Sequence, residues 1–160
     1  MLGIHVVLLE PEIPANTGNI SRTCLATNAT LHLIHPLGFS TDDKMLKRAG
    51  LDYWKSVKVE HHDSIEELYS NYQSGEFYYI EDFGEQYYSD VDFSDSDREL
   101  FFVFGKETAG IPESILEEAK DRVLKIPMAE HELVRSLNLS NVVAIIVYDV
   151  LKQQGFPKLK

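Results

Sequence analysis

Short apolar runs alternate with segments of helical periodicity along almost the whole chain, and this alternation constrains the fold more than any other feature. Strands that alternate with helices are typical of α/β domains, because each helix carries the chain back to the start of the next parallel strand. The run Leu-Phe-Phe-Val-Phe at 100–104 contains no polar residue, as expected for a central strand covered on both faces. The sequence therefore predicts an α/β fold with a mainly parallel sheet flanked by helices.

The predicted elements can be placed by residue number. Strands are expected at residues 4–9, 31–34, 57–59, 77–80, 100–104 and 123–126. Helices are expected at residues 17–28, 44–50, 64–72, 112–120 and 136–153. The last helix is apolar on every side, which predicts that it is buried. The acidic stretch 81–99 contains Ser, Asp and Gly and is predicted to be a long surface loop.

The size and composition of the chain favour one globular domain that spans residues 1–160. No apolar run reaches the roughly 20 residues that a membrane helix needs. The N-terminus has neither the basic region nor the small-residue cleavage site of a signal peptide. A single cysteine, Cys24, allows no internal disulfide. We therefore expect a cytoplasmic protein with no membrane anchor.

The net charge of −11 argues at first against a nucleic-acid partner. The charge is unevenly distributed, however. Residues 1–58 carry a net charge of +1, residues 59–119 carry −15, and residues 120–160 carry +3. The acidic middle is expected to form a solvated face. A polyanion can still bind to the mildly basic ends if that face is turned away.

The sequence lacks the motifs of several common nucleotide-binding and metal-binding sites. The first strand is not followed by Gly-x-Gly-x-x-Gly, Gly105-Lys106 does not continue as a P-loop, and His131-Glu132 lacks the second His of a zinc protease. Cys24 is expected in the core. The adjacent pair His61 and His62 lies in a polar stretch and is expected on a solvated surface, so no metal site is predicted.

Three glycine- or polar-rich turns remain, at residues 16–22, 105–110 and 135–141, and each follows a strand-like run. Ligands of open α/β sheets bind beyond the carboxyl ends of the strands, which is where such turns lie. Glycines let a backbone approach a ligand closely, and Glu107 can accept hydrogen bonds from ligand hydroxyls. Asn19 and Arg22 share a helical face beside an N-terminus suited to phosphate. Ordinary helix caps and turns are the alternative explanation for each segment taken alone.

Together the three turns resemble motifs of the SPOUT (SpoU-TrmD) class of RNA methyltransferases. These motifs are Asn-x-Gly-x-x-x-Arg at 16–22, Gly-x-Glu-x-x-Gly at 105–110, and Ser-Leu-Asn-x-Ser at 136–140 with Tyr at 148. Segments 10–14, 35–39, 43–44, 48–53 and 125–128 are similar to one subfamily, the small tRNA wobble-nucleotide 2′-O-methyltransferases. The resemblance runs from about residue 2 to residue 157, and no appended RNA-binding domain is expected.

The resemblance implies a C-terminal trefoil knot (the SPOUT fold), a homodimer, and S-adenosylmethionine as cofactor. The cofactor-binding residues that it implies are Ile80, Gly105, Leu124, Ile126, Met128, Ser136 and Leu137. The catalytic residues that it implies are Arg22, Glu107 and Asn138. The residues expected to contact RNA are Asn16, Asn19, Arg22, Lys44, Arg48, Arg135 and Tyr148.

The activity that the resemblance implies is methylation of the ribose 2′-OH of the wobble cytidine or uridine, in the anticodon loop of leucine tRNAs. Arg22 would reach the acceptor nucleotide across the dimer. Because a guanidinium is always protonated, we expect Arg22 to orient the ribose or a phosphate, with a substrate phosphate or water accepting the proton. Methylation of ribosomal RNA or of another tRNA position, and a non-catalytic RNA-binding role, are the alternatives.

Overall fold

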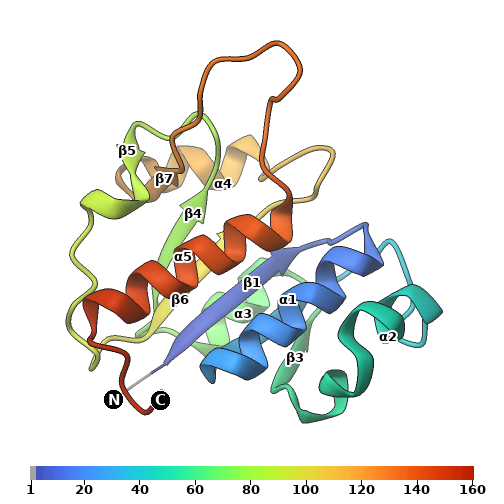
Figure 1. The fold of residues 1–160 in the computed structure, drawn as a ribbon. Coiled ribbons are helices and arrows are strands. Elements are labelled where there is room, and N and C mark those ends of the chain that lie inside the picture. Colours follow the sequence, from blue (N-terminus) through green and yellow to red (C-terminus); the bar gives the residue numbers. More distant parts are fainter. Residues whose placement is uncertain (1–2) are drawn as a thin grey trace.

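The computed structural model describes residues 3–160 and arranges them as one twisted sheet between two layers of helices (Figure 1). The strands are β1 (Ile4–Leu9), β2 (Thr30–Ile34), β3 (Val59–His62), β4 (Glu76–Ile80), β5 (Gln86–Tyr87), β6 (Leu100–Phe104) and β7 (Val123–Lys125). The α-helices are α1 (Pro14–Thr27), α2 (Lys44–Gly50), α3 (Ile65–Asn71), α4 (Glu113–Glu118) and α5 (Leu139–Gln153). Short 3₁₀ helices are η1 (Leu51–Ser56), η2 (Tyr88–Asp90) and η3 (Lys120–Arg122).

The sheet has the strand order β3-β2-β1-β6-β4-β7-β5, and each of its strand pairs is parallel. The predicted α/β class and parallel sheet are therefore confirmed. β1 and β6 lie at the centre, and every residue of both strands is buried, because helices cover both faces of the sheet. β3 is an edge strand of only four residues.

The two faces of the sheet bury two separate apolar clusters. One cluster joins alternate residues of the central strands, such as Val6 and Phe102, to Ile20 of α1 and Val147 of α5. The other joins the intervening residues of the strands, such as Phe101, to α3 and α4. This division follows from the period of two in a strand, which sends successive side chains to opposite faces.

Cys24 lies in the first cluster and is fully buried, as the sequence predicts. Burial raises the pKa of its thiol to about 12, because desolvation disfavours the thiolate. We therefore expect Ellman's reagent at pH 8 to modify no thiol in the folded protein and one thiol per chain in denaturant. Rapid modification of the folded protein would contradict this placement of α1.

Several predicted boundaries are wrong. The last helix begins at Leu139 rather than at residue 136, because the Asn138 side chain caps it. That helix buries one face only, and Tyr148 on it is 44% exposed. The predicted strand 57–59 is displaced, since β3 begins at Val59. The acidic stretch 81–99 also contains β5 and η2, which sequence periodicity does not predict.

No helix of the described residues is long and apolar enough to cross a bilayer.

Candidate active site

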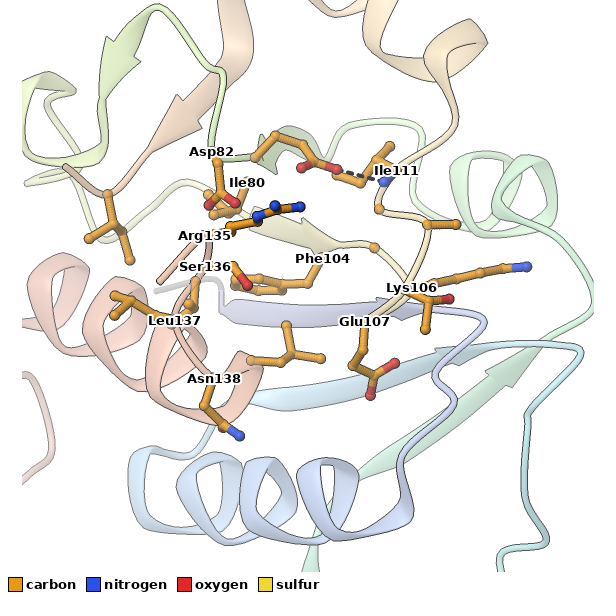
Figure 2. A pocket seen from close by; sticks show the side chains of 18 of the residues that line it. Ile80, Asp82, Phe104, Lys106, Glu107, Ile111, Arg135, Ser136, Leu137 and Asn138 are labelled. Carbon is orange, nitrogen blue, oxygen red and sulfur yellow. Dashed lines mark hydrogen bonds between the residues drawn. The ribbon is translucent and has the colours of Figure 1, made fainter. Parts of the chain in front are cut away.

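A cavity of about 590 Å³ opens beyond the carboxyl ends of β4, β6 and β7 (Figure 2). Its walls come from four segments that are distant in sequence: residues 80–83, 104–111, 126–128 and 135–139, with Ile13, Asn16 and Val142 completing the lining. Figure 2 shows Ile80, Phe104 and Leu137 around it, with Arg135 and Ser136 on the same side. The cavity thus has apolar walls and several polar groups, and its volume lies within the roughly 300–1,000 Å³ typical of small-molecule sites.

The turn after β6 requires glycine at both of its ends. A Cβ on Gly105 would lie 2.3 Å from the carbonyl carbon of Gly110 and 2.4 Å from the nitrogen of Ile111. Gly110 has a φ of +69°, and a Cβ there would lie 2.7 Å from the Glu81 carboxylate. The backbones at the two ends of the turn are therefore in close contact, and only glycine fits at both positions.

Glu107 holds this turn against the segment that follows β1. Its carboxylate accepts hydrogen bonds from the backbone N–H groups of Glu12, at 3.0 Å, and Ile13, at 3.2 Å. Glu12 makes a second contact between the same two segments. Its carboxylate accepts a hydrogen bond from the Thr108 hydroxyl at 2.7 Å and one from the Thr108 N–H at 3.3 Å. The hydrogen bonds from the hydroxyl and the N–H of Thr108 lower the pKa of Glu12. Glu107 is thus engaged with backbone rather than free to meet ligand hydroxyls.

Replacing Glu107 with glutamine tests this contact. An amide presents one acceptor oxygen and one NH₂ group, so one of the two backbone N–H groups loses its partner. Because the contact is partly exposed, we expect a loss of about 1 kcal/mol in the free energy of unfolding and a severalfold weaker affinity for S-adenosylmethionine, the cofactor that the resemblance implies. Urea unfolding and calorimetry measure the two effects. Glu117→Gln, on the exposed side of α4, is the control and should change neither.

Asn138 joins the start of α5 to the start of α1. Its Oδ1 accepts hydrogen bonds from the N–H and the hydroxyl of Ser140, at 2.9 and 2.5 Å, which caps α5. Its Nδ2 donates to Oδ1 of Asn16, at 3.1 Å. Two of the motifs therefore meet through a single pair of amides at the cavity wall.

Glu81 is the main cavity residue that the sequence did not single out. Its carboxylate accepts a hydrogen bond from the N–H of Ile111 at 2.6 Å, drawn as a dashed line in Figure 2. Burial raises the pKa of this carboxyl. The available signal in the sequence is a glutamate directly after the apolar run 77–80, but its acidic neighbours favour a surface loop. Glu81 fixes the turn after β6 from the side opposite to Glu107.

Six of the seven predicted cofactor-binding residues line the cavity: Ile80, Gly105, Ile126, Met128, Ser136 and Leu137. Leu124 is not in the cavity lining, because its side chain is fully buried in the core; its carbonyl accepts from the N–H of Glu81 at 3.0 Å. The further predicted residues that line the cavity are Glu107, Asn138, Asn16 and Arg135.

The remaining predicted residues lie outside the cavity. Arg22 is exposed on α1, and its guanidinium carbon lies 5.2 Å from the centre of the Tyr53 ring. The others are also exposed: Asn19 on α1, Lys44 and Arg48 on α2, and Tyr148 on α5. Arg22 therefore does not line the cavity of its own chain.

Comparison with known proteins decides the family. The model of the SpoU rRNA methylase family matches residues 3–148, which is most of the chain. The chain belongs to the SpoU methylase family.

Two similar proteins match this chain over almost its whole length. A protein of Bacillus subtilis, provisionally named tRNA (cytidine(34)-2′-O)-methyltransferase, is 59% identical over 160 residues, which cover 100% of this chain and 99% of that protein. A solved structure described as giving "structural insights into the 2-OH methylation of C/U34 on tRNA" has a TM-score of 0.87 and 38% identity, and covers 96% of this chain and 97% of that one.

A SpoU methyltransferase of Streptomyces viridochromogenes, solved in complex with the cofactor AdoMet, has a TM-score of 0.79 and 21% identity. The match covers 99% of this chain and 59% of that one. At this identity the likeness shows the shared fold. The family uses S-adenosylmethionine.

Proposed function

We propose that this protein transfers a methyl group from S-adenosylmethionine to the ribose 2′-OH of the cytidine or uridine at position 34 of tRNA. The observation that carries the proposal is the cavity, because three motifs that are far apart in sequence meet around it. The name of the relative at 59% identity and the description of the solved structure at 38% identity support tRNA as the substrate and nucleotide 34 as the position of the methyl group.

The residues present fit the proposed cofactor. Ile80, Ile126 and Leu137 offer apolar surface to an adenine ring, and Gly105 and Gly110, where a Cβ has no room, let a ligand approach the backbone of the turn. Bound there, S-adenosylmethionine would supply a methyl group already activated on a sulfonium. Glu107 and Asn138 hold the walls in place, so we assign both to organising the site.

The chain must also position the acceptor ribose and lower the cost of the charge that develops on its 2′ oxygen. We assign this role to Arg22, with Asn19 beside it and the exposed cations Lys44, Arg48 and Arg135 contacting phosphates. A permanently protonated guanidinium is a poor base, so a substrate phosphate or water takes the proton.

The proposal includes a homodimer in which Arg22 serves the cavity of the partner chain. Exposed apolar side chains near the cavity and on α5 support it: Leu133 is 84% exposed, Val134 48% and Tyr148 44%. We also propose that the segment before α5 forms the trefoil knot that the resemblance implies, within a single domain. The long connection from β7 to α5, which supplies Arg135 and Ser136 to the cavity, supports this.

Mixed dimers test the shared site. At a concentration of S-adenosylmethionine too low to saturate Gly105→Ala, Arg22→Ala and Gly105→Ala should each retain only a small part of the activity alone. A mixture refolded together should recover part of the activity, because one of its two sites then combines an intact cavity with an intact Arg22. If each site were built from one chain, the mixture would show no such recovery.

Transfer of labelled methyl from S-adenosylmethionine to unmodified tRNA and to ribosomal RNA, in parallel, tests the substrate. We expect label in tRNA alone. Label in ribosomal RNA would favour the alternative substrate, and cofactor binding without transfer to either would favour a non-catalytic RNA-binding protein.

A further inference from the structure

A cluster of histidines and carboxylates lies on the face of the sheet that α3 covers, opposite to α1 and α5. It comprises His5 on β1, His32 on β2, and Glu60 and His62 on β3. Glu60 and His62 are two residues apart and therefore point to the same side of the strand, and His32 is paired with Glu60 across the two strands. His32 is fully buried and His62 is 4% exposed, so the expectation that His62 lies on a solvated surface is wrong.

Three atoms of this cluster converge. Nδ1 of His32 lies 3.0 Å from Nε2 of His62 and 3.4 Å from Oε2 of Glu60, and Nε2 of His62 lies 3.8 Å from Oε2 of Glu60. Ligand atoms about 2.1 Å from a tetrahedral zinc ion are themselves about 3.4 Å apart. The observed separations bracket that value, and two imidazoles with one carboxylate are ligands that zinc accepts.

The hydrogen bonds of His5 determine which nitrogen of His32 carries the proton and which has a lone pair available to a metal ion. Nε2 of His5 lies 3.1 Å from the Glu99 carboxylate, so it carries the proton and leaves Nδ1 as an acceptor. Nε2 of His32, 2.8 Å from that Nδ1, must then donate. Nδ1 of His32 thus presents a lone pair to His62 and Glu60, as in metal-binding histidines whose other nitrogen donates.

Two further observations concern the other ligands. The Tyr72 hydroxyl donates to both oxygens of Glu60, at 2.9 and 2.7 Å, which fixes the carboxylate. Nδ1 of His62 is buried and has no hydrogen-bond partner among residues 3–160. This nitrogen stays without a partner whether Nε2 of His62 donates to His32 or binds a metal, so the convergence of the other three atoms is the observation that points to an ion.

We propose that His32, Glu60 and His62 form a binding site for a divalent transition-metal ion, best matched by Zn²⁺, that fastens the edge strand β3 to β2. The site is structural and separate from the candidate active site, because none of its three residues lines that cavity. It departs from the expectation, drawn from the sequence, that the protein has no metal.

Zinc binding to the whole protein, after treatment with a chelator and its removal, tests the site. We expect one Zn²⁺ per chain by calorimetry, and a rise of about 5–10 °C in Tm when free Zn²⁺ is a hundredfold above its Kd. His32→Gln and His62→Gln should each weaken binding at least tenfold. The control is His61→Gln, since His61 is exposed on the same strand and contacts His35 instead, at 2.8 Å. It should bind zinc as the unaltered protein does.

Absence of zinc binding in the unaltered protein would overturn the proposal. So would loss of binding in His61→Gln together with its retention in His62→Gln, because the exposed pair His35 and His61 would then be the ligands. If the buried variants fail to fold, imidazole NMR signals of the unaltered protein decide. Zinc should shift the signals of His32 and His62 and leave those of His35 and His61 in place, and the reverse pattern would refute the site.

Discussion

Arg22→Ala is expected to reduce methyl transfer to tRNA about 10²- to 10³-fold and to leave the affinity for S-adenosylmethionine unchanged. The reason is that Arg22 is exposed and lies outside the cavity of its own chain, so the variant removes the group proposed to meet the substrate and leaves the cavity walls undisturbed. The size follows from the usual cost of removing one group that stabilises developing charge. Single-turnover rates and calorimetric titration with the cofactor measure the two quantities.

Two further variants separate charge from geometry at Arg22. Arg22→Lys keeps the positive charge but loses the planar fork, so we expect it to recover only a small part of the rate. Arg122→Ala, which removes an exposed arginine at the end of η3, is the matched control and should keep full activity. Near-normal turnover in Arg22→Lys would show that only the charge matters. Loss of cofactor binding in Arg22→Ala would contradict the assigned role.

Gly105→Ala is expected to weaken the binding of S-adenosylmethionine at least tenfold and to lower Tm by about 5 °C. The added Cβ would overlap the backbone of Gly110 and Ile111, at 2.3 and 2.4 Å, so the turn between β6 and α4 has to move. Forced movement in a packed site costs about 1–3 kcal/mol. Calorimetry and thermal unfolding measure the two effects.

The control for this variant is Gly3→Ala. A Cβ on Gly3 has its nearest neighbour 3.5 Å away, at Nε2 of His5, which is an ordinary contact. We expect Gly3→Ala to bind the cofactor normally. Normal binding by Gly105→Ala would show that the turn is not part of the cofactor site.

The sheet was predictable from the sequence because its strands are buried on both faces. The run Leu100–Phe104 contains no polar residue, which is typical of a strand buried on both faces. The strand found there has the predicted limits. Turns rich in glycine could also be placed, since they follow these strands directly. The meeting of residues 105–110, 126–128 and 135–139 in one cavity was implied by resemblance, because spacing along a chain does not reveal which loops adjoin.

Other features depend on partners that are distant in sequence. Ser136 and Leu137 directly precede α5 and are predicted from the sequence to belong to it, but the capping bonds of Asn138 begin the helix after them. His62 follows a polar neighbour and resembles a surface residue, yet α3 covers its side of the sheet. Glu81 belongs to an acidic stretch and was assigned to solvent, because its partner, the N–H of Ile111, is 30 residues away.

The most direct test of the proposed activity uses two tRNAs that differ by one oxygen. A tRNA assembled with an ordinary ribose at position 34 and a second with a 2′-deoxyribose there are each incubated with the protein and labelled S-adenosylmethionine, and products are mapped by mass spectrometry. We predict one 2′-O-methyl group at nucleotide 34 of the first tRNA and none in the second. Equal labelling of both, or a methyl group at any other nucleotide, would contradict the proposed reaction.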